Sequence, residues 1–140
     1  MVKEIQPISL EDALVVLGQR ITPATVQNEK GIPPLDTLVY EESFRSYNTQ
    51  ISKAVRAFEK HAERYQNTFW GKISGNPRKK EEKVKEYVTE FLKAKTWWNV
   101  YYHYKHELVY EVRIASGHGA RWKVSSLEFI GFVEPFLDEE

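Results

Sequence analysis

The 140-residue sequence predicts a single α+β domain, in which a short helix and a long helical hairpin pack on a C-terminal three- to four-stranded antiparallel meander. Two observations lead to this fold class. Apolar residues recur at helical spacing in two long segments, 44–69 and 84–94, and they alternate with polar residues in the last third of the chain. The length is close to that of one domain, about 150 residues. A hydrophobic fraction of 41% with 4 Trp, 8 Tyr and 7 Phe provides ample core material.

Residues 1–34 are predicted to hold a short helix and a connector. Ser9 is expected to cap a helix from Leu10 to Leu17, because a hydroxyl at this position accepts a hydrogen bond from an unpaired N–H group of the first turn. Gly18 ends the helix, since glycine adopts the positive φ of a helix C-terminus without strain. Proline and glycine then recur through residues 19–34, which indicates an irregular connector.

Residues 35–96 are predicted to form the helical hairpin. Its first helix is expected to run from an N-cap at Asp36 to about residue 70, because one apolar stripe recurs at spacings of three and four. The stripe consists of Phe44, Tyr47, Ile51, Val55, Phe58, Ala62, Tyr65 and Phe69. Lysine and arginine take other positions, and His61 beside the stripe is expected to be a surface residue. A second helix is expected after Pro77, antiparallel to the first, with an apolar face of Val84, Tyr87, Val88, Phe91, Leu92 and Ala94.

Residues 97–135 are predicted to form the antiparallel sheet, followed by an acidic tail at 136–140. Alternating apolar residues mark strands around 108–114 and 120–124, and Gly131 in a third strand indicates a bulge or a close packing point. The expected core comprises Phe44, Ile51, Val55, Phe58, Val84, Phe91, Leu108, Tyr110, Val112 and Trp122.

Charge and cysteine content exclude several classes of protein. The formal net charge is zero, although residues 72–96 carry 8 Lys or Arg against 4 Asp or Glu. A neutral chain argues against strong nonspecific nucleic-acid binding, but a local basic patch remains compatible with RNA. The absence of cysteine excludes disulfides, thiolate zinc sites and a cysteine nucleophile. No secretory signal or membrane-spanning run is visible, so a cytoplasmic protein without membrane contact is expected.

The strands centred on Tyr110 and Trp122 place their charged residues on one face. Side chains alternate along a strand, so Glu111, Arg113, Arg121 and Lys123 must face away from the core, with His106 or Tyr104 near one end. Carboxylates, cations and a histidine are what metal-independent RNA cleavage requires: groups that move protons and cations that stabilise the phosphorane. Cross-strand ion pairs on a solvated sheet face remain the alternative interpretation.

The glycine-flanked His118 lies in the turn between these strands, where it is either a polar turn tip or part of an anion site with Arg121. In the ribonuclease hypothesis, the catalytic residues are Glu111 with His106 or His118, while Arg113, Arg121 and Lys123 hold phosphate. The order of helices followed by a small antiparallel sheet resembles compact toxin-type ribonuclease folds at the level of architecture.

An aromatic run at 97–104 motivates the leading hypothesis. It contains more large rings than one face of a strand can bury, so some must reach the surface or seal the junction between helices and sheet. Exposed Trp and Tyr are enriched at protein interfaces, and they also stack on single-stranded bases. The proposed binding residues are Trp97, Trp98, Tyr101, Tyr102 and Tyr104. The leading hypothesis is therefore a non-catalytic module that binds a protein partner or a second copy of itself.

No motif for a cofactor or a metal is present. His103 and His106 lie three residues apart, but no third ligand follows at a useful spacing. Phosphate-binding loops, dinucleotide fingerprints and nucleophile elbows are also missing from the sequence. No cofactor and no metal are therefore expected, and the sequence leaves open whether the chain is an enzyme.

Overall fold

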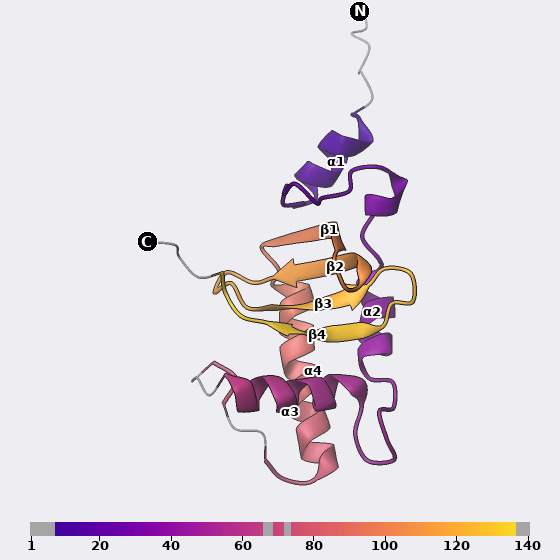
Figure 1. The fold of residues 1–140 in the computed structure, drawn as a ribbon. Coiled ribbons are helices and arrows are strands. Elements are labelled where there is room, and N and C mark those ends of the chain that lie inside the picture. Colours follow the sequence, from indigo (N-terminus) through magenta and orange to yellow (C-terminus); the bar gives the residue numbers. More distant parts are fainter. Residues whose placement is uncertain (1–7, 66–68, 72–73, 137–140) are drawn as a thin grey trace, which may run out of the picture.

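The computed structural model describes residues 8–65, 69–71 and 74–136, and in these ranges it shows four α-helices and a four-stranded antiparallel sheet. The helices come first and the strands last (Figure 1), so the predicted α+β class is confirmed. The helices α2, α3 and α4 pack on one face of the sheet, the inner face. The opposite, outer face carries the charged residues.

The sheet is a meander in the order β1-β2-β3-β4, formed by Trp97–His103, Glu107–Arg113, Gly119–Lys123 and Phe129–Val133. Its register places Glu111 between Asn99 and Arg121 on the neighbouring strands. Between β3 and β4 the pairing shifts, so that Arg121 lies opposite Gly131 and the next residue lies opposite Phe129. Of the two expectations for Gly131, this irregularity next to it favours a bulge over a close packing point.

The inner face of the sheet is buried against α4 (Pro77–Lys93), which begins after an Asn76 side chain that accepts from the backbone of Lys79. Large aromatic rings fill the layer between helices and strands, since Phe58 packs edge-on against Phe132. Seven of the ten predicted core residues are fully buried, namely Val55, Phe58, Val84, Phe91, Tyr110, Val112 and Trp122. The other three, Phe44, Ile51 and Leu108, are partly buried against the same core.

The single helix predicted over 36–70 is wrong. The structure instead contains α2 (Asp36–Ser43) and α3 (Lys53–Arg64), separated by a loop at residues 44–52. Asn48 causes the break, because its side chain accepts hydrogen bonds from the backbone N–H groups of residues 50 and 51 and so competes with helical pairing. Helix α3 crosses α4 instead of running antiparallel to it (Figure 1), and residues 66–68 of the predicted helix lie outside the described residues.

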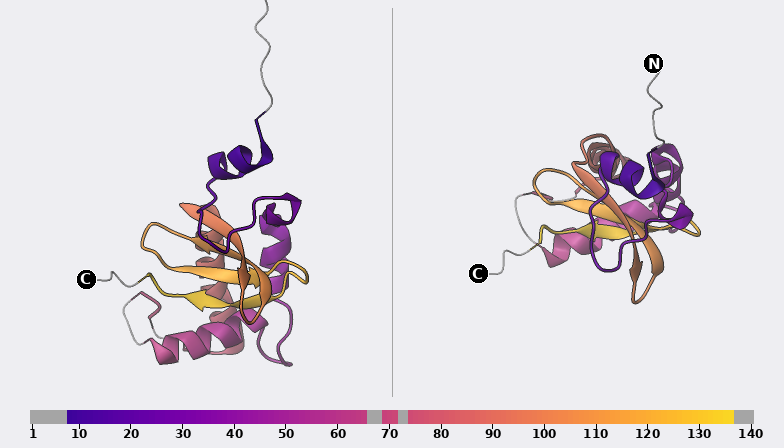
Figure 2. Two further views of the ribbon diagram at one scale, coloured as in Figure 1. Left: turned by 45° about the horizontal axis from the view of Figure 1, so that its top comes forward. Right: turned by 90° about the horizontal axis from the view of Figure 1, so that it is seen from above.

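The N-terminal segment covers the β1 edge of the sheet. Helix α1 (Leu10–Val16) is capped by Ser9 and ends before Gly18, which has φ 103°, as expected. The following connector pairs with β1, since Arg20 N–H donates to the carbonyl of Trp98 at 2.8 Å. It then enters a short 3-10 helix, η1 (Glu29–Gly31). Figure 2 shows this segment beside β1, away from α3. Within the part of the chain that the structure describes, no helix is long and apolar enough to span a membrane.

A buried hydrogen bond between α2 and β3 provides a test of the fold. The Oγ atom of Ser43 accepts from Nε1 of Trp122 at 2.8 Å and donates to the carbonyl of Val39. We expect Ser43→Ala to lower the free energy of unfolding by about 1–3 kcal/mol, because it leaves a buried indole N–H group unpaired. Urea unfolding followed by tryptophan fluorescence measures this. The exposed Ser126→Ala is the control, and an equal effect of both variants would contradict the prediction.

Candidate active site

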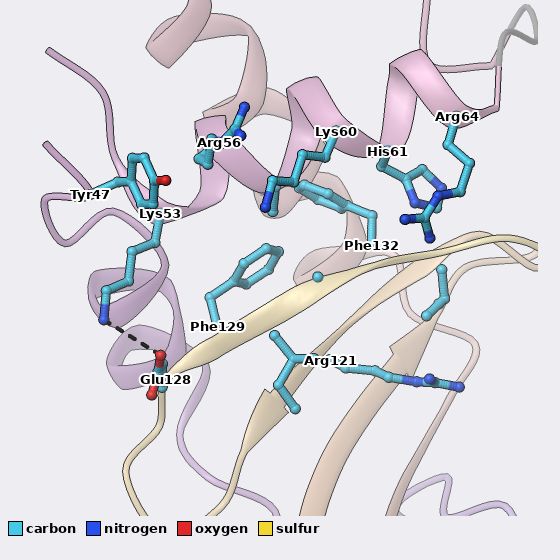
Figure 3. Close-up of a pocket in the computed structure, with 14 residues that line it drawn as sticks. Tyr47, Lys53, Arg56, Lys60, His61, Arg64, Arg121, Glu128, Phe129 and Phe132 are labelled. Carbon is cyan, nitrogen blue, oxygen red and sulfur yellow. Dashed lines mark ion pairs between the residues drawn. The ribbon is translucent and has the colours of Figure 1, made fainter. Parts of the chain in front are cut away.

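An open groove of about 620 Å³ lies between α3 and β4 (Figure 3). Positively charged side chains dominate its polar lining: Lys53, Arg56, Lys60, Arg64 and Arg121, with His61 among them and Glu128 as the acidic member. Lys53 approaches that carboxylate only to 3.7 Å. The groove therefore presents a strongly cationic surface, which is suited to a polyanionic ligand.

The cations gather because α3 is amphipathic. Residues 53, 56, 60 and 64 follow one another at spacings of three and four, and residues 57 and 61 lie beside them, so all six occupy one face of the helix. The opposite face buries Ala54, Val55 and Phe58 in the core. Burial of these apolar residues orients the helix, and the charged face is thereby held over β4.

At the end of the groove, the carboxylate of Glu134 gathers donors from distant parts of the chain. Trp70 Nε1 donates to Oε1 at 2.6 Å, and His61 Nε2 lies 3.2 Å from the same oxygen. His118 Nε2 lies 3.3 Å from Oε2, while its Nδ1 lies 2.8 Å from Oγ of Ser116. The side chains of His61, His118 and Glu134 are only 11%, 12% and 19% exposed. This arrangement orients both imidazoles.

Burial lowers the pKa of His61 below 6.5, and Glu134 opposes this shift through its hydrogen bond and its charge. The pKa of His118 is lowered for the same reason, again against the effect of Glu134. A positive charge on His118 also lowers the pKa of His61, because like charges repel. At neutral pH both rings are therefore mainly neutral and can accept protons.

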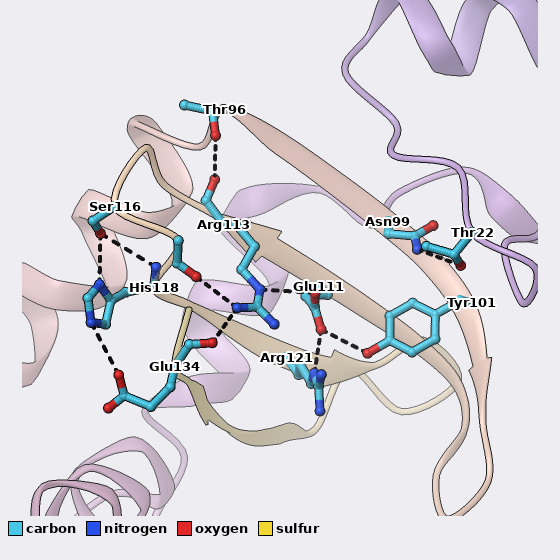
Figure 4. Close-up of polar contacts among 11 residues, drawn as sticks. Thr22, Thr96, Asn99, Tyr101, Glu111, Arg113, Ser116, His118, Arg121 and Glu134 are labelled. Carbon is cyan, nitrogen blue, oxygen red and sulfur yellow. Dashed lines mark hydrogen bonds and ion pairs between the residues drawn. The ribbon is translucent and has the colours of Figure 1, made fainter. Parts of the chain in front are cut away.

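A second polar network occupies the outer face of the sheet (Figure 4). Glu111 accepts hydrogen bonds from Tyr101 Oη at 2.8 Å, from Arg113 Nε at 3.1 Å and from Arg121 Nε. Burial raises the pKa of Glu111, but the charges of Arg113 and Arg121 outweigh burial and leave that pKa below its ordinary value. Glu111 is only 3% exposed. This carboxylate therefore stays ionised and holds the two guanidinium groups in place.

The two networks are joined. Arg113 Nη1 donates to the carbonyls of Gly117 and Glu134, so one guanidinium links the outer face to the site of the histidines. Arg121 lines the groove as well as binding Glu111. Its cross-strand neighbour Gly131 has no side chain, and an added Cβ there would meet no atom within 4 Å. Arg121 and Gly131 therefore lie side by side in the lining of the groove.

The structure brings together four of the residues in the ribonuclease hypothesis, namely Glu111, Arg113, Arg121 and His118. It does not bring His106 or Lys123 into this network. His106 lies beside the ring of His103 after β1, and Lys123 pairs with Glu128 at 3.7 Å. The expected face of charged residues is present, but Glu111 and Arg113 are buried within it instead of solvated.

The aromatic run divides between the core and the surface. Trp98 is buried and donates to the carbonyl of Leu17, so its expected place on a binding surface is wrong. Trp97 and Tyr101 are half-buried, whereas Tyr102 and Tyr104 are exposed. The segment therefore partly seals the sheet against the connector, and its two exposed tyrosines remain open to a ligand.

Sequence reasoning missed His61 and Glu134. It placed His61 at the surface, but the ring packs 4.8 Å from that of Trp70 and contacts Glu134. The sequence did contain a signal for His61, because lysine and arginine occupy the positions around it on one helical face. No group of three or more His, Cys, Asp or Glu side chains among the described residues could hold a metal ion.

Comparison with known proteins gave two matches. Residues 40–134 match the profile of the CdiA C-terminal tRNase toxin domain family. The structure is similar to the crystal structure of the toxic C-terminal tip of CdiA from Pseudomonas aeruginosa in complex with immune protein, with a TM-score of 0.57 and 23% sequence identity. That similarity covers 67% of this chain and 99% of the other. No curated protein sequence was found to match the chain.

Removal of the charge of Glu134 tests its influence on the two imidazoles. In Glu134→Gln the carboxylate no longer favours the imidazolium forms, so we expect the pKa of His61 and that of His118 to fall further below 6.5. NMR titration of the histidine ring protons measures both values. Glu128→Gln, which removes a carboxylate from the other part of the groove, is the control. Unchanged titration of both rings in Glu134→Gln would show that the carboxylate does not control them.

Proposed function

The chain belongs to the CdiA C-terminal tRNase toxin domain family, and on this basis we propose that it cleaves tRNA in the groove between α3 and β4. The observation that carries the proposal is the cationic groove with His61, a neutral imidazole oriented by Glu134, at one end. The family match favours the ribonuclease alternative over the non-catalytic module that the aromatic run suggested. It supports an RNA substrate for the basic groove.

We assign proton abstraction to His61. Its Nε2 faces Glu134, so the ring is oriented as in other carboxylate–imidazole pairs and its Nδ1 can accept the proton of a ribose 2′-OH. The 2′-oxygen then attacks phosphorus, the bond from phosphorus to the 5′-oxygen breaks, and the leaving oxygen takes a proton from water in the open groove. The products are a 2′,3′-cyclic phosphate and a 5′-hydroxyl end.

Arg121 stabilises the negative charge that develops on the phosphorane. It lines the groove, and its Nε is held by Glu111. Glu111 acts through Arg121 and is a positioning residue, because it is buried below the groove surface. Figure 3 shows His61 and Arg64 at the same end of α3, where the second guanidinium adds positive charge. His118 supports Glu134 from the other side.

We also propose a protein partner for this chain. The similar CdiA tip was solved with an immune protein, which supports a protein-binding surface in addition to an RNA-binding groove. Association with a second copy of the chain stays a prediction from the sequence. Activity on tRNA further requires that the domain reach a compartment that contains tRNA.

Cleavage of purified total tRNA tests the function directly. We expect His61→Gln and Arg121→Ala to lower the cleavage rate by on the order of 100-fold or more, since each removes a group that acts on the reacting phosphate. Cleavage should continue in excess EDTA because side chains supply both groups. The control is Arg78→Ala, which removes an exposed charge of α4 outside the groove lining. Arg121→Lys and circular dichroism distinguish lost charge from lost structure, and a parent protein that leaves tRNA intact refutes the proposal.

The pH dependence identifies the base. His61 must be neutral to accept a proton, and burial lowers its pKa below 6.5, so we expect kcat/KM to fall as the pH drops through a value below 6.5 and to be level near neutrality. Glu134→Gln should move this fall to still lower pH. Initial rates on a fluorogenic RNA between pH 4.5 and 8 measure it. A profile that is unchanged in Glu134→Gln would assign the titrating group elsewhere.

A further inference from the structure

Tyr47 lies at the opposite end of the groove from His61 (Figure 3). Its side chain is 53% exposed although it belongs to a tightly bonded turn. Its backbone N–H donates to the carbonyl of Ile51 at 3.0 Å, and the isolated bridge between Ser46 and Ser52 closes the turn around it. A large ring is thus presented to solvent on a backbone that hydrogen bonds hold in place.

Arg56 lies next to this ring and completes the local chemistry. Its guanidinium carbon is 5.7 Å from the ring centroid of Tyr47. Its Nε is buried and has no hydrogen-bond partner within the described ranges, although a buried N–H group of a guanidinium normally has one. The pair therefore combines an exposed aromatic face with a guanidinium cation that lines the groove.

The distance along α3 between the Tyr47 end of the groove and His61 indicates what this pair binds. Lys53 and His61 are separated by eight residues, which is about 12 Å along a helix. The cations between them, Arg56 and Lys60, line the same groove. An RNA strand whose phosphates follow these cations from His61 places a base at Tyr47. That base belongs to a neighbouring nucleotide and not to the one that is cleaved at His61.

We propose that Tyr47 and Arg56 form a nucleobase-stacking subsite for a single-stranded nucleotide that flanks the scissile bond. This inference rests on the proposed RNA cleavage for the direction in which the RNA lies along the groove. The role it gives to Tyr47 and Arg56 is binding and not catalysis. The ring of Tyr47 stacks on the base, and Arg56 donates to the adjoining phosphate. Because every base has a π-face, the subsite selects unpaired RNA over duplex more than it selects sequence.

Fluorescence anisotropy with a labelled 2′-O-methyl RNA hexamer tests the subsite, because the methyl group prevents attack by the 2′-oxygen. Stacking on one aromatic residue contributes about tenfold in affinity, so Tyr47→Ala should weaken binding by roughly that factor while Tyr47→Phe binds like the parent. An abasic hexamer of equal charge should bind equally to the parent and to Tyr47→Ala. Ile32→Ala removes an apolar side chain of similar exposure, 51%, outside the groove and should leave hexamer affinity unchanged.

The inference is overturned if Tyr47→Ala binds the hexamer within twofold of the parent, or if it loses affinity equally for the abasic hexamer. Far-UV circular dichroism of Tyr47→Ala establishes that the turn change has not unfolded α3. The two proposals fail separately. A parent that binds the hexamer through Tyr47 but does not cleave an unmodified hexamer or tRNA refutes the cleavage and supports the subsite.

Discussion

The carboxylate of Glu134 holds together parts of the chain that are otherwise far apart. It follows β4 directly, and its partners His61, Trp70 and His118 come from α3, from the turn after α3 and from the β2–β3 loop. A buried carboxylate is costly unless its oxygens are paired, so these contacts depend on one another. Loss of the carboxylate would leave two buried imidazoles and an indole N–H group without their common partner. Together with the buried apolar face of α3, this interaction connects the C-terminal part of the helix to the segment after β4.

The site consists of two groups of polar residues that have different roles. On the outer face of the sheet, Glu111 is fully paired and buried with Arg113, so it supplies rigidity and fixes Arg121. In the groove, His61 and the cations of α3 remain accessible to a ligand. Arg121 belongs to both, because it binds Glu111 and also lines the groove. In the proposed cleavage, Arg121 supplies the preorganised positive charge and His61 the base.

Local sequence patterns were sufficient to predict much of the fold. Alternation in β2 and β3 correctly placed Glu111, Arg113 and Arg121 on one face, because the side-chain period of a strand follows from its backbone geometry. Capping by Ser9 and the end of α1 before Gly18 were likewise predictable from local hydrogen bonding. The apolar stripe continues through Tyr47, however, and so concealed the turn at 44–52. There the side chain of Asn48 pairs with the backbone and competes with the helix.

The sequence by itself determined the α+β class, the core and the face of the sheet that carries charge, since each depends on residue type and on the period of one element. Only the tertiary structure decided that His61 meets Glu134, 73 residues away in the chain, and that the basic face of α3 lies along β4. Tertiary packing also decided that Glu111 is buried among donors instead of solvated. Local periodicity specifies which way a side chain points. What that side chain meets depends on how separate elements pack, and this packing is set by the burial of apolar surface that the whole chain shares.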